Sequence, residues 1–350
     1  MDTIIAKIQH NDSDEAIYMK AAQILKNGGL VAFPTETVYG LGANALDETA
    51  SAKIYAAKGR PSDNPLIVHI ADVADLYKLA VGIDERVKRV ANAFWSGPLT
   101  MILKKNQCVP DSITGGLDTV AIRMPSHFVA ANLIKKSGIF IAAPSANISG
   151  RPSPTRAKHV ICDMNGIIDM IIEDDEVNVG IESTIVDLSA DKPTILRPGY
   201  ITKAQLEQVL GEVFVDPAIQ GSVADGVTPK APGMKYKHYS PKAKVIIVEG
   251  KETAVIDAIN HLTQEKQFKG LKVGIMTCSE NAQQYKADVV FDMGSRCDEA
   301  SNARKLFEAL RFFDEKGADY VYSESFPTKN VGAAVMNRLI KAAGHTILHV

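Results

Sequence analysis

Cysteine is scarce in this chain of 350 residues. The four cysteines, Cys108, Cys162, Cys278 and Cys297, lie far apart in the sequence, and no two of them form a CxxC pair. Zinc fingers, zinc ribbons and disulfide scaffolds need closely and regularly spaced cysteines. We therefore expect reduced thiols that hold no metal, and a protein that folds in a reducing compartment.

The chain also lacks an excess of positive charge and a long apolar segment. Its 39 lysines and arginines against 41 aspartates and glutamates give a net charge of -2 at pH 7. Strong direct binding of nucleic acid is not expected, because it needs a surplus of cations to neutralise phosphates. No stretch is long and apolar enough to span a bilayer, and the first residues lack a basic signal-peptide segment. We predict a cytoplasmic protein with no membrane contact.

Common nucleotide and metal motifs are missing or out of context. The sequence contains neither the G-x-x-x-x-G-K-[ST] of a P-loop nor the H-E-x-x-H of a zinc peptidase. Residues 40–45 match the dinucleotide fingerprint G-x-G-x-x-A, but that fingerprint should lead directly from a strand into a helix. Polar residues 35–39 intervene here, so we interpret the match as a coincidence. No metal-binding residues are predicted.

What is present indicates two α/β domains. Hydrophobic residues make up 46% and charged residues 23% of the chain, as in ordinary soluble proteins, and the length exceeds one average domain. Strands and helices follow in irregular order in residues 1–213, which favours an α+β domain with a mixed sheet. Residues 214–242 are rich in proline and glycine and predict a linker. Strands alternate with helices in residues 243–350, which predicts a smaller Rossmann-like parallel α/β domain.

Residues 33–42 form the loop that carries most polar chemistry. The apolar run 30–33 predicts a buried strand that ends at Pro34, which cannot continue a central ladder. Two threonines, a glutamate, a tyrosine and two glycines follow within eight residues. A loop at the end of a buried strand is a common place for a ligand site. We predict a ligand-binding loop in which Gly40 and Gly42 allow a tight backbone path.

A second set of residues suits a bound anion. Lys58 and Arg60 flank a glycine at the end of a predicted helix, and an ammonium and a guanidinium both bind phosphate oxygens well. Asn64 follows, and Ser145 and Asn147 come directly after the predicted buried strand 139–143. Short hydroxyl and amide side chains at strand ends can hold phosphate or ribose without adding charge.

Three further polar residues lie within apolar runs. Arg123 and Arg197 must be paired or ligand-bound if they are buried. Each alone is more often a surface side chain or half of a structural ion pair than a ligand contact, but together with Lys58 and Arg60 they favour an anion site. His69 alternates with apolar neighbours, which by itself predicts a hydrogen-bonded core histidine rather than a ligand.

The order of these motifs resembles the YrdC-like family. The matching stretches are residues 33–42, Lys58-Gly59-Arg60-Pro61 with Asn64-Pro65-Leu66, residues 145–150, residues 182–187 and Arg197-Pro198-Gly199. The pairs Lys-x-Arg and Ser-x-Asn are the family's hallmark, and both are intact. The run from Pro232 to Pro241, followed by an α/β domain, resembles the two-domain form of the family, so the likeness covers nearly the whole chain.

The resemblance implies both a fold and an activity. The first domain would hold a twisted mixed sheet with an open concave face. The activity would be that of a nucleotidyltransferase, forming L-threonylcarbamoyladenylate and pyrophosphate from L-threonine, bicarbonate or CO2, and ATP with Mg²⁺. The product would pass to the tRNA threonylcarbamoyl transferase machinery, which modifies tRNAs that read ANN codons.

The resemblance also assigns roles to particular residues. The residues that would bind L-threonine are Thr37, His69, Arg123, Ala143 and Ser183. The residues that would bind ATP are Arg60, Asn64, Thr119, Ser145, Asn147, Ser153, Arg197 and, in the linker, Tyr236. Lys58 and Arg60 would also serve catalysis by offsetting charge on the phosphates. The linker is expected to close over the site as a lid.

Two other functions remain open at this stage. A concave face with several lysines and arginines also suits an RNA-binding, translation-associated module, although the net charge and the lack of RNP-type aromatic motifs disfavour it. The second alternative function is carbamoyl transfer, because hydrogenase-maturation carbamoyltransferases contain a related domain. The zinc fingers of those proteins have no counterpart in this cysteine spacing. The sequence predicts neither the role of the C-terminal domain nor the oligomeric state.

Overall fold

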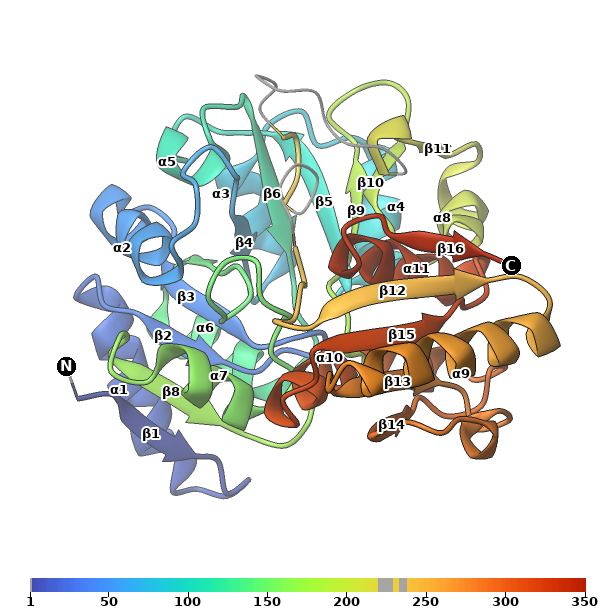
Figure 1. Cartoon of the computed structure of the whole chain (residues 1–350). Coiled ribbons are helices and arrows are strands. Elements are labelled where there is room, and N and C mark those ends of the chain that lie inside the picture. Colours follow the sequence, from blue (N-terminus) through green and yellow to red (C-terminus); the bar gives the residue numbers. More distant parts are fainter. Residues whose placement is uncertain (1, 220–228, 233–237) are drawn as a thin grey trace. The chain divides into compact units, whose positions relative to one another are not determined.

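The structure is a computed structural model that describes residues 2–219, 229–232 and 238–350. The chain divides into two compact units (Figure 1). The first unit comprises residues 1–149 and 153–235, and the second comprises residues 150–152 and 236–350. The predicted linker, 214–242, begins with a short strand, and much of the rest of it lies outside the described residues. No helix in the described ranges is long and apolar enough to cross a membrane.

The first unit is built on one mixed sheet of 11 strands. Parallel pairs such as β4–β6 and β5–β9 occur beside antiparallel pairs such as β2–β3 and β5–β6, which confirms the predicted mixed-sheet class. In spatial order the strands are β1 (Ile4–Lys7), β8 (Met170–Glu173), β2 (Val31–Phe33), β3 (Gly40–Asn44), β7 (Ile141–Ala142), β4 (Ile67–His69), β6 (Thr119–Arg123), β5 (Leu99–Lys104), β9 (Thr184–Asp187), β10 (Thr194–Arg197) and β11 (Phe214–Val215).

Helices cover one face of this sheet and part of the other. On one side α1 (Asp14–Lys26) and α6 (Phe128–Ser137) pack on β2, β7 and β8. The larger core lies on the opposite side, beneath the remaining helices. Those helices are α2 (Glu48–Lys58), α3 (Leu76–Leu79), α4 (Glu85–Phe94), α5 (Asp111–Thr114), α7 (Ala157–Met164) and α8 (Lys203–Leu210), with 3-10 turns η1 (Val73–Asp75) and η2 (Pro217–Ile219).

The α1/α6 side of the sheet has a second, smaller apolar cluster over β4, β6, β5 and β9. Its strand residues are Ile67, Ala121, Ile102 and Ile185, joined by Leu196 of β10 and by Ala231. Strand neighbours such as Val68 and Ile122 face the opposite core, as the alternation of side chains along a strand requires. This cluster contains no helix residue among the described part of the chain. We call this part of the sheet the open face.

Most predicted elements of the first unit are present, and the differences have local causes. Residues 202–205 have the sequence spacing of a capping box, and Thr202 and Gln205 form one at the start of α8. Residues 40–44 form the strand β3 rather than a turn into a helix, so the dinucleotide match is indeed a coincidence. Glycine is needed there because a Cβ on Gly42 would lie 2.8 Å from atoms of both Phe33 and Ile141. The strands β1 and β8 were not predicted.

The second unit is a parallel α/β domain, as predicted. Its five strands are, in spatial order, β14 (Val289–Asp292), β13 (Val273–Thr277), β15 (Tyr320–Glu324), β12 (Lys244–Glu249) and β16 (Ile347–His349). α9 (Glu252–Phe268) packs on the face that carries Val273 and Ile275, and a 3-10 turn η3 (Ala282–Gln284) follows β13. α10 (Glu299–Glu315) and α11 (Asn330–Ala342) pack together on the other face, where Phe313 fills the space beside Gly274.

Candidate functional site

A row of polar side chains crosses the open face. His69 at the end of β4 pairs in register with Arg123 at the end of β6, and Arg123 pairs with Thr100 of β5. All three are buried, and Thr100 Oγ1 lies 2.8 Å from Ser183 Oγ, just before β9. Arg197 at the end of β10 completes what we call the polar row. These side chains bring two positive charges and two hydroxyls to the sheet face that carries the smaller apolar cluster.

Arg197 is held by the residues around it. Its Nε donates to the Ser183 carbonyl at 3.0 Å, and its Nη2 donates to Ser183 Oγ at 3.1 Å. A third hydrogen bond, 3.4 Å long, joins Nη1 to the Pro232 carbonyl. Both predicted arginines are buried and both are paired, as expected for a guanidinium in an apolar run.

Glu36 is the partner of Arg123. Glu36 Oε1 lies 2.8 Å from Arg123 Nη2, and both side chains are almost fully buried. Burial, the largest effect, raises the pKa of Glu36, but the charge of Arg123 together with hydrogen bonding to the carboxylate holds this pKa below its usual value. Among the described residues, Glu36 Oε2 and Arg123 Nε have no hydrogen-bond partner. The pair therefore keeps unused acceptor and donor atoms inside the site.

His69 is a neutral histidine. Burial, followed by the positive charge of Arg123, lowers the pKa of His69 from 6.5 to about 3. Its Nδ1 lies 3.1 Å from the Ile67 carbonyl. The imidazole beside Arg123 therefore adds polarity to the row without adding charge.

The loop that carries Glu36 and Thr37 is fixed by its own hydroxyls. Thr35 Oγ1 donates to the Val38 carbonyl at 2.7 Å and accepts from the Thr37 amide at 3.2 Å. Thr37 is fully buried, and its hydroxyl lies 2.9 Å from that of Thr35. The carbonyls of Glu36 and Thr37 accept hydrogen bonds from the amides of residues 179 and 180. Glu36 is thus presented to Arg123 by a well-braced loop.

A second group forms at the end of α2. Lys58 is 2% exposed, and its Nζ donates to the Asn147 carbonyl at 2.6 Å and to the Ser145 carbonyl. The Ser149 amide in turn donates to the Lys58 carbonyl. The Lys-x-Arg and Ser-x-Asn motifs are therefore brought together, with the ammonium bound to backbone oxygens of the loop that follows β7.

Arg60 and Asn64 lie together in the turn after α2. Arg60 Nη2 donates to the carbonyls of Pro65 at 3.1 Å and Asn64 at 3.3 Å. The Asn64 side chain is 1% exposed, and its Oδ1 has no hydrogen-bond partner among the described residues. A buried amide oxygen of this kind is an acceptor available to a ligand.

The remaining predicted residues are spread around these groups. Thr119 begins β6 and, by strand alternation, shares the face of Arg123. The Ala143 amide donates to the Ile67 carbonyl, so only its carbonyl is left for a ligand. Ser153 is buried and donates to Glu182 at 2.6 Å. Tyr236 lies outside the described residues, as do residues 220–228 and 233–237 of the predicted lid.

Sequence reasoning missed Glu36, Thr100 and Glu182 as site residues. Thr100 did leave a signal, because it is a polar residue in the otherwise apolar run from Leu99 to Leu103. Glu36 stood within the predicted ligand loop, but its partner is 87 positions away in the sequence and was not evident from spacing.

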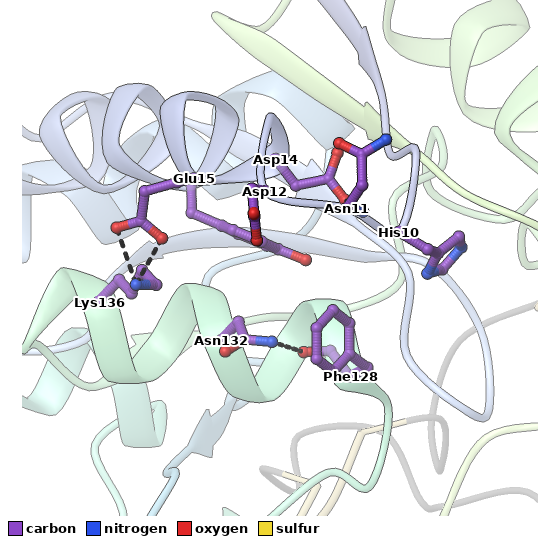
Figure 2. A pocket seen from close by; sticks show the side chains of 9 residues that line it. His10, Asn11, Asp12, Asp14, Glu15, Phe128, Asn132 and Lys136 are labelled. Atoms are coloured by element: carbon purple, nitrogen blue, oxygen red, sulfur yellow. Dashed lines mark hydrogen bonds and ion pairs between the residues drawn. The ribbon is translucent and has the colours of Figure 1, made fainter.

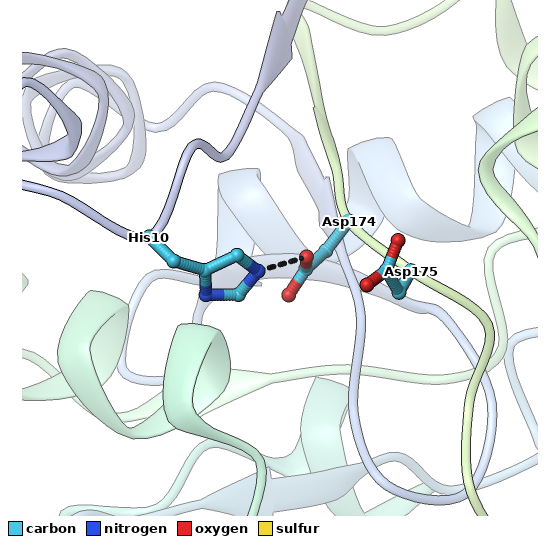
Figure 3. A group of neighbouring side chains, drawn as sticks. All are labelled: His10, Asp174 and Asp175. Carbon is cyan, nitrogen blue, oxygen red and sulfur yellow. Dashed lines mark hydrogen bonds and ion pairs between the residues drawn. The ribbon is translucent and has the colours of Figure 1, made fainter.

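Two other polar features lie in the first unit. His10, Asp174 and Asp175 bring possible ligand atoms within 4.8 Å of one another (Figure 3). His10 and Asp175 are exposed, and His10 Nε2 is already 2.8 Å from Asp174, so the group does not by itself indicate a metal. A depression of about 730 Å³ lies beside α1 and α6, where Lys136 pairs with Glu15 (Figure 2). It shares no residue with the polar row.

Comparison with known proteins covers both units. Residues 23–199 match the family described as Telomere recombination, which groups Sua5, YciO and YrdC, and residues 201–344 match the family described as Threonylcarbamoyl-AMP synthase, C-terminal domain. The threonylcarbamoyl-AMP synthase of Pyrococcus abyssi is 49% identical over 348 residues, covering 99% of this chain and 100% of that relative. That of Bacillus subtilis is also 49% identical, covering 94% and 93%.

A solved structure agrees with these matches. The structure of P. abyssi Sua5 complexed with L-threonine has a TM-score of 0.93 and 48% identity, and the match covers 100% of both chains. Family matches to both units, together with identity over the full length, show that the chain belongs to the threonylcarbamoyl-AMP synthase family.

Proposed function

We propose that this chain condenses L-threonine, bicarbonate or CO2, and ATP into L-threonylcarbamoyladenylate and pyrophosphate. The polar row on the open face is the observation that carries the proposal. Relatives that match along the whole chain are named for this product, and one of them was solved with L-threonine. The product would serve the machinery that adds threonylcarbamoyl groups to tRNAs reading ANN codons.

The geometry around Arg123 supports a site for threonine. A guanidinium can bind a carboxylate through two parallel hydrogen bonds, and the contact with Glu36 fixes the orientation of Arg123. The hydroxyls of Thr37 and Ser183 suit the threonine hydroxyl. Neutral His69 and the carbonyl of Ala143 suit its amino group, because neither brings a positive charge.

The residues around Lys58 support a site for ATP. Arg60 and Arg197 carry fixed charge for the phosphates, while Asn64 offers a buried amide oxygen to a ribose hydroxyl or the base. Four more polar residues are proposed to contact the nucleotide: Thr119, Ser145, Asn147 and Ser153. Because Lys58 is bound to carbonyls of the loop after β7, we assign it a second role in holding that loop.

The proposed reaction needs no covalent intermediate on the protein. The threonine nitrogen, as the free amine, takes up CO2 and releases a proton to water, which gives a carbamate. A carbamate oxygen then attacks the α-phosphorus of ATP. The bond from that phosphorus to the β-phosphate oxygen breaks, and pyrophosphate leaves. Holding two reactants in line is worth roughly 7–11 kcal/mol of barrier. Mg²⁺ would enter with ATP, held mainly by phosphates and water, because Glu36 and Glu182 are already engaged.

Pyrophosphate release tests the proposal directly. The protein is incubated with MgATP, bicarbonate and each of the common amino acids in turn. We expect release that depends on both threonine and bicarbonate. Arg123→Lys keeps the charge but loses the bidentate fork, so kcat/KM for threonine should fall by about 10²-fold. Arg89→Lys on the exposed side of α4 is the matched control and should be unchanged.

Other outcomes of the same assay separate the alternatives. Release that does not depend on threonine, or that is unaffected by Arg123→Lys, would refute the assignment. Retention of RNA without pyrophosphate release would favour an RNA-binding module. Use of carbamoyl phosphate in place of bicarbonate would favour carbamoyl transfer.

A further inference from the structure

A cavity of about 260 Å³ lies in the second unit at the carboxyl ends of its parallel strands. Its walls come from the end of β12 and the start of α9 (Val248, Gly250, Glu252, Val255), from the loops that follow β13 and β14 (Asn281, Arg296), and from the end of β15 (Glu324, Ser325). All of these belong to one compact unit, and none belongs to the site described above.

The cavity sits where the order of the strands reverses. β12 and β15 are neighbours, with Val248 paired to Glu324. The chain leaves β12 into α9 on one face of the sheet and leaves β15 into α11 on the other face. In open parallel sheets, ligands bind outside the carboxyl ends of the strands at such a reversal point.

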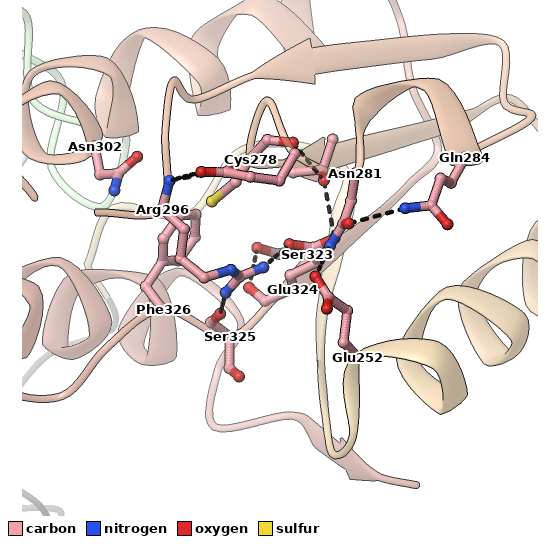
Figure 4. A network of polar contacts seen from close by, with 12 residues as sticks. Glu252, Cys278, Asn281, Gln284, Arg296, Asn302, Ser323, Glu324, Ser325 and Phe326 are labelled. Atoms are coloured by element: carbon pink, nitrogen blue, oxygen red, sulfur yellow. Dashed lines mark hydrogen bonds and ion pairs between the residues drawn. The ribbon is translucent and has the colours of Figure 1, made fainter. Parts of the chain in front are cut away.

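Glu324, a buried carboxylate, lines this cavity, and Figure 4 shows the polar network around it. Glu324 is 2% exposed, and its Oε1 accepts hydrogen bonds from Thr277 at 2.9 Å, Asn281 at 3.0 Å and Tyr285 at 2.6 Å. Its Oε2 pairs with Arg296 Nη2, while Arg296 Nη1 donates to the Ser325 carbonyl at 2.9 Å.

This network has the form of a binding site. An apolar cluster would fill the same space without the cost of burying charge, so ion pairs of this kind are weak contributors to stability. The Arg296 side chain keeps 33% of its surface exposed, and one edge of it lines the cavity. Convergent charged groups around an open cavity are the usual mark of a small-molecule site.

The charges in the cavity select the ligand. Glu252 stands in the first turn of α9 and accepts from Asn281 Nδ2 at 2.9 Å. Two carboxylates and one guanidinium therefore line the space. A phosphate at the start of this helix would be repelled by the Glu252 carboxylate, whereas an ammonium group there would be attracted by it.

The size and the backbone of the cavity point the same way. Its volume is below the roughly 300–1,000 Å³ of pockets for drug-sized ligands. The turn from β12 to α9 contains a single glycine, Gly250, and Val350 fills the space beside it, so the glycine-rich cradle of a dinucleotide site is missing here. A small zwitterion fits, with its ammonium at Glu252 and its carboxylate at Arg296. We propose that this cavity binds a free α-amino acid.

A fluorine probe beside the cavity tests this in the full-length chain. Cys297 is exposed and follows Arg296. Changing Cys108 and Cys162 to serine removes the other exposed thiols, and burial raises the pKa of Cys278 to about 12, which keeps it unreactive. The chain is labelled at Cys297 with a trifluoromethyl reagent and titrated with each L-amino acid, followed by ¹⁹F NMR.

We expect a saturable shift with at least one L-amino acid, with a Kd of about 1 mM or lower. Glu252→Gln should weaken that affinity by roughly tenfold, whereas Asp257→Asn, an exposed residue of the same helix, should not change it. Arg296→Lys should also weaken binding, and both variants should keep the circular dichroism spectrum of the parent.

The titrations are repeated in an Arg123→Ala background, which removes the threonine contact proposed for the first unit. A saturable shift that persists there comes from the second unit, whatever the fate of the proposed synthase activity. Failure of all amino acids to give a saturable shift up to about 10 mM, or an equal affinity in Glu252→Gln, would overturn the proposal.

Discussion

Arg123 forms a buried ion pair with Glu36, and that pairing governs the chemistry around it. Both side chains are almost fully buried. In a buried ion pair, removing one partner costs more stability than the pair itself contributes. The guanidinium therefore stays in one orientation before any ligand arrives. Such preorganisation is what a site needs to bind a small carboxylate without reordering its own side chains.

The first prediction at this scale concerns Glu36→Gln. The change leaves a buried guanidinium uncompensated, so the free energy of unfolding at pH 7 should fall by about 3–5 kcal/mol. The lowered pKa of Glu36 means that the pair contributes fully above pH 4.5 and is lost as the pH falls through the folded-state pKa. Urea unfolding across pH should therefore show the difference from wild type shrinking only in acid.

Glu212→Gln, at an exposed position, is the control and should unfold like wild type. Equal stability of Glu36→Gln and wild type at pH 7 would show that Arg123 does not depend on this carboxylate. A stability difference that is already gone at about pH 6 would assign it to another group.

His69 gives the second prediction, which begins at a higher pH. Its pKa is about 3 in the folded chain and 6.5 when unfolded, so the unfolded chain binds more protons between these values. Stability should therefore fall as the pH drops below 6.5, by about 1.4 kcal/mol per pH unit at most. His69→Gln lacks this group and should have a flatter profile in thermal unfolding from pH 7 to 4. The same profile in His69→Gln and in the exposed control His261→Gln would contradict the assignment.

The end of α2 matters at the scale of the element. Lys58 is the last residue of the helix, where a cation interacts favourably with the helix dipole. Its ammonium binds two carbonyls of the loop after β7, 87 and 89 positions further along the chain. Helix end and loop are thus one structural unit, and both carry residues proposed to contact ATP.

Lys58→Met tests this connection. Loss of the catalytic role that the family resemblance implies for Lys58 would by itself reduce pyrophosphate release far more than folding. The two carbonyl contacts lead us to expect a loss of stability as well, of about 1–3 kcal/mol in total, because the Asn147 carbonyl loses the ammonium while the Ser145 carbonyl keeps the Asn147 amide as a donor at 3.0 Å. Urea unfolding and pyrophosphate release are measured together, with Lys20→Met on the exposed side of α1 as the control. A variant with wild-type stability and no activity would restore a purely catalytic role.

At the scale of the whole molecule, the division of the chain is not a single cut. Residues 150–152 belong to the second unit although the chain around them belongs to the first. Arg311 of α10 is buried and donates to the Pro152 carbonyl through Nε at 3.0 Å and Nη2 at 2.6 Å. The second unit is therefore completed by a segment that comes more than 80 residues earlier in the sequence.

A fragment of residues 236–350 tests this dependence. It retains the core between α9 and the parallel sheet, so we expect it to fold, but with two hydrogen bonds of buried Arg311 missing. Its unfolding midpoint in urea should rise with Arg311→Met, whereas the same change should destabilise the full chain by about 1–3 kcal/mol. The test is whether the two changes in stability have opposite signs. A purely local effect of the substitution would change the stability of the fragment and of the full chain in the same direction.

Much of this protein was determined by its sequence alone. Hydrophobic periodicity and capping residues such as Thr202 and Gln205 gave most helices and strands, because these signals act between near neighbours. Alternation of strands and helices gave the parallel sheet of the second unit. The ordered motifs, above all Lys-x-Arg and Ser-x-Asn, gave the family. Glycine-rich β3 escaped prediction because close packing around Gly42 requires that residue, not strand propensity.

The tertiary structure decided which groups meet. Glu36 finds Arg123, Thr100 finds Ser183 and Lys58 finds its two carbonyls through the order of strands in the sheet. In the first unit the apolar cluster over β4, β6, β5 and β9 contains no helix residue among the described residues. In the second unit the strand order places the cavity beside Glu324. These are contacts between residues far apart in the chain, and their partners are set by packing and topology, which local sequence signals do not encode.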